Sequence, residues 1–451
     1  MKIFQTLARP FVSFVERYYP DAFIFVIVLS LITFLSALFL TDSTVTSTLL
    51  AWGNGLPMLL KFTAQITIIM VGAHALAHTN PVQKFLTRIG QLPNSANQAY
   101  SLVAFTSGIA SLCAWSFGLV IGAIVARSVA SECAKKSFKI HYPLLVASAY
   151  SGFVIWHMGF SSSAALFVAT PGHLLEDRVG IIPVTETILS STNIVMALMA
   201  LAIITIICPL MRPKDKDIIE FTPNTIDNID NSALDNQSEL TLIEKFENHR
   251  ALNIFLGFAL VSYIVVTYTQ NGFSLNLNIV SWTFLAFGLI LAASPMHFIK
   301  LINNAAATVG PIILQYPFYS GIMGMMATTG LMKVITDWII SISTPETLGF
   351  FAFLSGGLVN MFIPSGGGQW AVQGPIMIEA ALSLNVNPSV VVLGVAYGDQ
   401  WSNMIQPFWT IPILAIAGLH MRQILGYTFV IFIMTGFLYG GGMLYMGSGN
   451  I

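Results

Sequence analysis

Residues 362–374 read FIPSGGGQWAVQG and interrupt a long apolar segment of the chain. Three consecutive glycines follow Pro364 and Ser365, and such a run does not continue a regular helix cheaply. Irregular backbone is tolerated at membrane depth only where protein buries it or where it lines a polar cavity. The stretch therefore predicts a re-entrant tip or a broken helix, and membrane transporters bind their solutes at such features.

The composition around this stretch is that of an integral membrane protein. The chain has 451 residues, of which 55% are hydrophobic and only 9% are charged. Soluble globular domains carry roughly 25% charged residues. The net charge of −1 gives no reason to expect a nucleic-acid partner. Three cysteines cannot all pair within one chain, so we expect free thiols.

Long apolar segments predict a polytopic all-α membrane protein with about nine full spans. Each segment reaches or approaches the roughly 20 residues that a helix needs to cross the hydrocarbon core. No small-residue cleavage site follows the first segment, so we expect it to be retained as a span. The segments are residues 22–40, 56–78, 143–172, 187–210, 252–270, 279–298, 308–330, 389–417 and 424–446.

Two further apolar regions, 98–133 and 348–383, are interrupted near their middles, at residues 113–118 and 364–368. Each arm then has about 15 residues, or about 22 Å of helix, against a hydrocarbon core of about 30 Å. Arms this short favour two re-entrant hairpins. Basic residues flank the first region on both sides, whereas the second has Lys333 before it, beside Asp337 and Glu346, and no basic residue in 384–388. The positive-inside bias therefore places the hairpins on opposite faces. It also predicts a cytoplasmic N-terminus and a periplasmic C-terminus.

Short motifs recur at an offset near 247 residues and predict two inverted repeats. FTSG at 105–108 matches FLSG at 353–356, and ASAYSG at 147–152 matches GVAYGD at 394–399. The first membrane half, 1–211, would hold hairpin 98–133 and broken helix 143–172. The second, 251–451, would hold hairpin 348–383 and broken helix 389–417. The acidic stretch 212–250 between them predicts a flexible cytoplasmic linker, with a regulatory docking site as the alternative.

Polar side chains gather at these four interruptions, and we expect them to form a binding site. The N-termini of half-helices favour an anion, and unwound carbonyls favour a small cation. The interruptions of the two broken helices contain no arginine, so neutral donors would hold the anion, and this suits a single carboxylate. The substrate-binding candidates are Ser116, Trp156, His157, Ser161, Ser162, Ser163, Ser365, Gly366, Gly367, Gly368, Gln369, Trp370, Ser402, Asn403 and Gln406. Candidates for the coupling ion or a proton are Asp399, Asn360 and Asn403.

Two interpretations remain open for several of these residues. His157 is either a packed, hydrogen-bonded histidine or a substrate donor or proton relay. Asp399, the only carboxylate in a break, is either a coupling site or the cap of a half-helix. Trp370 is either a packing residue or a stacking partner of the ligand. We expect no metal site and no cofactor. We also expect no enzyme, because no nucleophile or paired acid and base is visible.

Three stretches resemble the short-chain fatty acid transporter family, the bacterial carriers associated with acetoacetate and butyrate use. They are YSGFVIWHMGFSSSAALFVATPGH at 150–173, NMFIPSGGGQWAVQGPIMIE at 360–379 and YGDQWSNMIQPFWTIP at 397–412. The resemblance covers essentially the whole chain outside 212–250. It implies a carrier for short monocarboxylates in the bacterial inner membrane, with a role in lipid metabolism. The alternative is a channel or facilitator for the same anions.

More distantly, the chain resembles the ion-transporter superfamily, whose divalent-anion sodium symporters have two inverted hairpins and two broken helices. That resemblance implies symport, a homodimer and an elevator-type transport domain. Those symporters carry Ser-Asn-Thr motifs at their breaks, whereas Ser402, Asn403 and Met404 keep two of the three. Their sodium ligands therefore cannot be transferred, and Na⁺ and H⁺ both remain candidates for the coupling cation.

Overall fold

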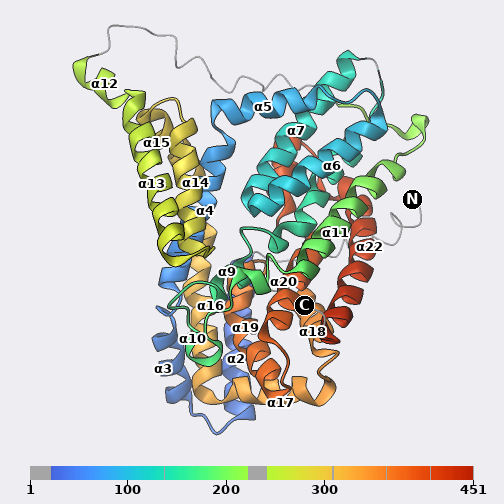
Figure 1. Ribbon diagram of the computed structural model, residues 1–451. Helices are drawn as coiled ribbons and strands as arrows, with labels where there is room; N and C mark the ends of the chain where they lie inside the picture. The colour runs from blue at the N-terminus through green and yellow to red at the C-terminus, as the bar shows by residue number, and fades with distance from the viewer. Residues whose placement is uncertain are drawn as a thin grey trace.

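The structure is a computed structural model that describes residues 22–136, 138–221, 241–306, 309–361, 363–406 and 408–449. Within these ranges every regular element is a helix (Figure 1), so the all-α prediction is confirmed. Seven described helices are long and apolar enough to cross a membrane, or eight if the bent pair α16 and α17 forms one span. The predicted N-terminal flank, residues 1–21, and residues 222–240 of the predicted linker lie outside the described residues.

The first half of the chain runs from α2 to α11. Its membrane-length and shorter helices are α2 (Ala22–Leu40), α3 (Val45–Gly55), α4 (Leu60–Ala77), α5 (Asn80–Gly90), α6 (Ala96–Cys113), α7 (Trp115–Lys135), α8 (Tyr142–Ser151), η1 (Gly152–Met158), α9 (Ser163–Val168), α10 (Glu176–Val179), η2 (Val184–Glu186) and α11 (Ser191–Leu210).

The rest of the chain runs from η3 to α22. It contains η3 (Asp215–Asp217), α12 (Leu242–Glu247), α13 (Arg250–Asn271), α14 (Leu277–Leu291), α15 (Pro295–Ala306), α16 (Gly310–Thr329), α17 (Leu331–Ile342), α18 (Leu348–Asn360), α19 (Gly366–Ser383), α20 (Pro388–Ser402), η5 (Asn403–Ile405), α21 (Thr410–Ala417) and α22 (Met421–Gly447).

The helices form two packed groups (Figure 1). In the first, α3 and α2 pack on α16, and α4 packs on α14. In the second, the pairs α6–α7 and α18–α19 pack around α8 and α20, and α11 packs against α22. The groups meet where α19 contacts α16 and α17, and where α4 contacts α7. A hairpin arm is therefore part of the contact between the groups.

The two interrupted regions fold as antiparallel helix pairs, here called hairpin 1 (α6–α7) and hairpin 2 (α18–α19). Their arms have 18 and 21 residues in hairpin 1, and 13 and 18 in hairpin 2. Three of the four arms are therefore longer than the expected length of about 15 residues. In hairpin 1 the interruption is confined to Ala114, and the helices continue into polar ends at Ser95 and Lys136.

The stretch forms the tip between α18, which ends at Asn360, and α19, which begins at Gly366. The prediction that the glycines themselves lie in the interruption is wrong, because they are helical. Ser365 is the N-cap of α19, and its Oγ accepts a hydrogen bond from the Gly368 N–H. The three glycines form the first turn, and the non-helical residues precede them. An N-cap contributes about 1 kcal/mol, which offsets the entropic cost of a glycine in the turn that it caps.

Each half contains a hairpin, a broken helix and a closing helix in the same order. The broken helices are α8–η1–α9 and α20–η5–α21, and the closing helices are α11 and α22. Figure 1 shows hairpin 1 toward the end of the molecule that carries α5, and hairpin 2 toward the end that carries α17. This placement fits an inverted repeat, which stays a prediction.

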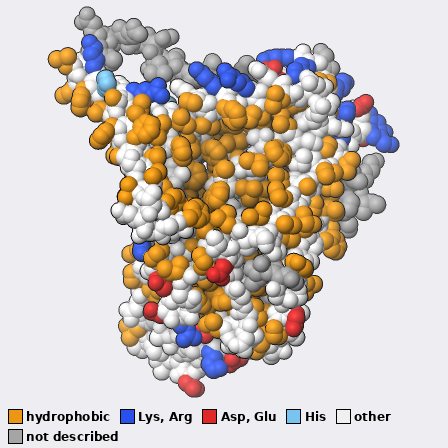
Figure 2. Space-filling model, viewed as in Figure 1, with side chains coloured by type: hydrophobic (Ala, Val, Ile, Leu, Met, Phe, Trp, Pro, Cys, Tyr) orange, Lys and Arg blue, Asp and Glu red, His pale blue; other side chains and the backbone are white. Residues whose placement is uncertain are grey.

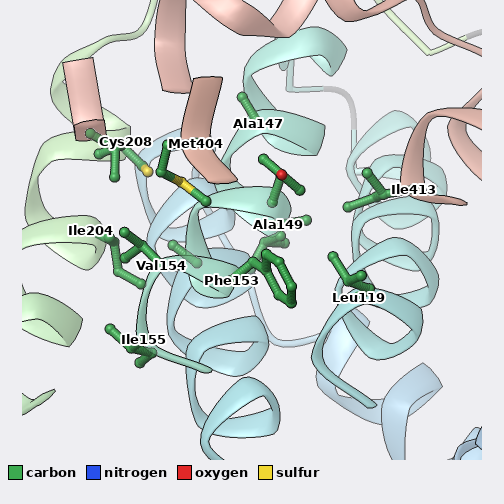
Figure 3. Close-up of a cluster of buried hydrophobic side chains, with 14 of the residues drawn as sticks. Leu119, Ala147, Ala149, Phe153, Val154, Ile155, Ile204, Cys208, Met404 and Ile413 are labelled. Carbon is green, nitrogen blue, oxygen red and sulfur yellow. The ribbon is translucent and has the colours of Figure 1, made fainter. Parts of the chain in front are cut away.

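The outer surface is apolar across its middle (Figure 2). In this view Lys and Arg gather along the edge near α5 and α12, and Asp and Glu lie mostly toward the opposite end. Inside, an apolar cluster packs η1 against α7, α11, η5 and α21 (Figure 3). Phe153 of η1 and Met404 of η5 lie in this cluster, so the core joins the two broken helices directly.

Candidate functional site

The hairpin tips contact the two broken helices inside the protein. We call the non-helical and 3₁₀ residues between α8 and α9 break 1, and those that begin at Asn403 after α20 break 2. At the tip of hairpin 1, the Trp115 N–H donates to Oγ of Ser161 in break 1 at 2.9 Å. At the tip of hairpin 2, the first arm α18 ends at Asn360, and this residue contacts break 2. Each tip is thus held by a polar side chain.

Asn360 connects hairpin 2 to break 2 through its side-chain amide. Its Nδ2 lies 3.0 Å from the Asp399 carbonyl, 2.8 Å from Oγ of Ser402 and 2.7 Å from Oδ1 of Asn403. The backbone carbonyl of Asn360 accepts from Nε2 of Gln406. The Oδ1 of Asn360 has no hydrogen-bond partner among the described residues. The amide therefore fixes the tip and leaves one oxygen available.

The two breaks are also linked to each other. The Tyr150 hydroxyl, on the helix that leads into break 1, donates to the Asn403 carbonyl in break 2 at 2.7 Å. The His157 backbone N–H donates to Oε1 of Gln400 at 2.9 Å. These bonds cross between the halves, so the two broken helices meet in one polar cluster.

Gly366 lies where hairpin 2 meets break 1 and the last turn of α20, which carries Asp399. A Cβ at this position would lie 2.6 Å from Cη2 of Trp156, 2.9 Å from Cε1 of His157 and 3.2 Å from Oδ2 of Asp399. A Cβ on Gly367 would lie 2.6 Å from the Tyr316 hydroxyl oxygen. Only a residue without a side chain lets the first turn of α19 approach these groups so closely.

The His157 ring has one nitrogen in use and one that faces Asp399. Its Nε2 accepts from the Ala164 N–H at 3.3 Å, at the start of α9. A neutral ring with an accepting Nε2 carries its proton on Nδ1. That Nδ1 lies 3.9 Å from Oδ1 of Asp399, which is too long for a hydrogen bond, and has no other partner in the described ranges. The His157 ring thus accepts a hydrogen bond from the first turn of α9 and keeps a donor, Nδ1–H, that has no partner among the described residues.

Asp399 is buried and only partly paired. Its Oδ1 accepts from Nδ2 of Asn403 at 3.3 Å, and its Oδ2 has no hydrogen-bond partner within the described chain. Buried polar groups in proteins are nearly always hydrogen-bonded, so a carboxylate oxygen left open is an exception that needs a cause. A ligand or an ion at this position would supply the missing contact.

Other buried polar atoms around the tips lack partners in the described residues. The donors are Oγ of Ser116, Oγ of Ser162, Nε1 of Trp156, Nε1 of Trp370 and Nε2 of Gln400. Gln369 adds an open acceptor, Oε1. The open donors suit a carboxylate, and the open oxygens of Asn360, Gln369 and Asp399 suit a small hard cation.

The structure brings most of the predicted residues to this region but turns two of them elsewhere. Ser365 donates to the Tyr316 hydroxyl of α16 at 2.9 Å. The amide nitrogen of Gln369 donates within hairpin 2, to the Gly356 carbonyl at 2.9 Å and to Gln373 at 3.0 Å. Every predicted site residue except the half-buried Ser365 is buried. The site is therefore enclosed in this structure.

Sequence reasoning did not single out Gln400 or Tyr150 for the site. The sequence did offer a reason to include each of them in the site. Gln400 lies between the candidates Asp399 and Ser402 in the GDQWSN stretch, and Tyr150 belongs to the repeated motif ASAYSG. Tyr316 also went unnoticed, because nothing local to α16 places it at the tip of hairpin 2.

Helical hairpins, broken helices and an enclosed polar cluster within an apolar all-α fold define a membrane transporter. The fold is similar to the crystal structure of the YdaH transporter of Alcanivorax borkumensis, with a TM-score of 0.61 over 95% of this chain and 98% of that one. The sequence identity is 13%, so this likeness concerns the fold alone.

The sequence profile of the short chain fatty acid transporter family matches residues 3–446, and the chain belongs to that family. A protein of Escherichia coli K12 with the provisional name short-chain fatty acid transporter is 37% identical over 433 residues, which is 96% of this chain and 98% of that protein. A relative from Haemophilus influenzae with the same provisional name is 37% identical over 449 residues, covering 98% and 99% of the two chains.

Proposed function

We propose that the protein is a secondary active transporter that moves short-chain monocarboxylates, such as acetoacetate and butyrate, together with a cation. The observation that carries the proposal is the pairing of open donors with the open Oδ2 of Asp399 in one enclosed cluster. Family membership supports the class of substrate.

The carboxylate would bind beside the Trp156 and His157 rings, whose edges lie against Gly366. The donors are the Nδ1–H of His157, Nε1 of Trp156 and Nε2 of Gln400, all without partners in the part of the chain described here. No arginine lies in either break, so neutral donors would hold a single negative charge. The stacked rings of Trp156 and His157, 4.0 Å apart, offer an apolar edge for a short alkyl chain.

The cation would bind at Asp399, Asn360 and Asn403, where Oδ2 of Asp399 and Oδ1 of Asn360 have no partner among the described residues. Charge supplies the reason for coupling. Two carboxylates about 5 Å apart repel by about 3 kcal/mol at an effective dielectric constant of about 20. Neutralising Asp399 with Na⁺ or H⁺ removes that repulsion, so cation and substrate would favour each other's binding.

We further propose alternating access by an elevator-type movement in a homodimer built from two inverted repeats. The transport domain would contain both hairpins and both broken helices, and α2–α4 with α13–α16 would form the scaffold. The two groups meet where α19 contacts α16 and α17 and where α4 contacts α7, and at the tip of hairpin 2 Ser365 donates to Tyr316. The enclosed site favours a carrier over an open channel.

The expected orientation is multi-pass in the bacterial inner membrane, with the N-terminus in the cytoplasm and the C-terminus in the periplasm. The gathering of Lys and Arg at the end that carries α5 and α12 supports that orientation (Figure 2).

Uptake of labelled butyrate or acetoacetate into proteoliposomes tests the proposal. We expect saturable, gradient-driven uptake and counterflow of trapped substrate. Asn403→Ala should abolish both, because it removes contacts to Asn360 and Asp399. Asn304→Ala, an exposed asparagine on α15, is the matched control. Uptake by Asn403→Ala at the normal rate would refute the site, and uptake without counterflow or saturation would refute the carrier.

Two imposed gradients separate the coupling ions. Stimulation by an inward Na⁺ gradient with no effect of a pH gradient assigns Na⁺, and the reverse result assigns H⁺. Uptake that responds to neither gradient would contradict cation coupling.

A further inference from the structure

A small cavity lies outside the site, between α4, the segment that follows α9 and the start of α14. Its volume is about 100 Å³, and its lining includes Lys61, Phe62, Gln65, Phe167 and Gly172. Pockets for drug-sized ligands measure about 300–1,000 Å³. The cavity therefore has room for a few heavy atoms only. It lies between residues of both helix groups, which is where ligand sites commonly occur.

Lys61 is the cationic group of this cavity. Its Nζ lies 3.4 Å from the Pro171 carbonyl and forms no ion pair within the described ranges. Gly172 leaves room for the ammonium group, because a Cβ there would lie 3.2 Å from Nζ. Lys61 is exposed at the start of α4, so an anion that enters the cavity can reach its ammonium group.

The other polar groups of the cavity already have partners. Nε2 of Gln65 donates to Asn278 at 2.8 Å, and both ring nitrogens of His173 bond to backbone atoms of its own loop. The carboxylate on this loop, Glu176, accepts from the Gly172 N–H. Lys61 is thus the group left to bind a ligand, and its chemistry suits one carboxylate.

Phe62 and the tip of hairpin 2 separate this cavity from the central site. Phe62 and Phe167 line the cavity with ring centroids 5.1 Å apart. On its other side Phe62 packs against hairpin 2, since a Cβ on Gly367 would lie 2.7 Å from the Phe62 ring. The next residue, Gly366, contacts His157 and Asp399. The cavity therefore adjoins the hairpin tip that closes the site.

We propose that this cavity, the Lys61 vestibule, is a second carboxylate-binding site, where the short-chain monocarboxylate binds before it passes Phe62 to the central site. The inference rests on the proposed function for the identity of the ligand. Its position on the α10 side makes it an access site from one face of the membrane, and that face is periplasmic in the proposed orientation.

Transport kinetics give the first test. Lys61→Gln should raise KM for butyrate uptake about tenfold and leave the maximal rate within about twofold, because the central site is untouched. Lys333→Gln is the control, since Lys333 is exposed and pairs with Asp337 on the same helix. An unchanged KM in Lys61→Gln would overturn the inference.

A labelling experiment gives a readout that does not need transport. Leu174→Cys places an exposed thiol in the cavity lining, in a full-length background whose Cys113, Cys133 and Cys208 are replaced by alanine. An anionic methanethiosulfonate should label it several-fold faster than a cationic one, and butyrate should slow the labelling. Lys61→Gln should remove both effects.

The outcomes separate this inference from the proposed function. Butyrate uptake that is normal in Lys61→Gln, with no protection of the Leu174→Cys thiol, refutes the vestibule alone. Absence of butyrate uptake by the unaltered protein refutes the proposed function. Protection by butyrate in the Asn403→Ala background supports a vestibule that binds independently of the central site.

Discussion

Gly366→Ala is the substitution whose effect follows most directly from the structure. The new methyl group would lie 2.6 Å from Trp156, 2.9 Å from His157 and 3.2 Å from Asp399. The first two separations are below those that real Cβ atoms show, and both neighbouring rings are packed against each other. The tip of hairpin 2 must therefore move away from the breaks.

The size of the effect follows from the cost of overpacking. An extra carbon forced into a packed interior costs about 1–3 kcal/mol. Because the clash exists only when the tip is closed on the breaks, we expect the cost to fall on substrate binding. At 1.4 kcal/mol for each factor of ten, binding should weaken about 5-fold to about 150-fold. The fold should survive, since an open tip relieves the clash.

Equilibrium binding of labelled butyrate to the purified protein measures this effect, with thermal denaturation as the check on folding. Gly441→Ala is the matched control, because a Cβ at Gly441 in α22 has no neighbour within 4 Å. Gly366→Ala that binds butyrate like the unaltered protein would refute the closed packing of the tip against Trp156 and His157.

Three further predictions concern contacts around the site. Tyr150→Phe removes one of the two donors to the buried Asn403 carbonyl, which keeps the Gln406 N–H at 3.2 Å, and should lower the free energy of unfolding by about 0.5–1.5 kcal/mol. No change in denaturation would contradict the crossed bond. Arg178 and Glu379 form a half-exposed ion pair, in which Nε and Nη2 of the arginine lie 2.7 and 2.6 Å from the two carboxylate oxygens. A double-mutant cycle should give a coupling energy of about 0.2–1 kcal/mol. A clearly larger coupling energy would show that the pair is desolvated. Burial lowers the pKa of His141 from 6.5 to about 4, so the free energy of unfolding should decrease as the pH drops from 6.5 to about 4. In His141→Gln this dependence on pH should be weaker. Equal dependence on pH in the two proteins would refute the role of His141.

The sequence predicted the fold class and the approximate positions of the interruptions, because apolar length and glycine or proline content are local signals. It misjudged the geometry of the glycine run. The capping bond from Ser365 lets α19 begin at Gly366, and the reason for the glycines is close approach to Trp156 and His157. Composition alone cannot separate a glycine that ends a helix from one that starts a helix against a neighbour.

The site was predicted as a set of residues, but not as an arrangement. Nothing local to Ser365 shows that its hydroxyl points to Tyr316, which is 49 residues away in sequence. The bond from Tyr150 to Asn403 joins residues 253 positions apart. Such contacts depend on how the two halves pack, and a pattern within one half does not contain that information.

The central claim is that Asp399 couples a cation to the transport of a monocarboxylate, and Asp399→Asn tests it most directly. The amide is permanently neutral and nearly the same size. We predict that butyrate counterflow continues in Asp399→Asn proteoliposomes, while accumulation no longer responds to an imposed Na⁺ or pH gradient. Gradient-driven accumulation at the level of the unaltered protein would contradict the claim.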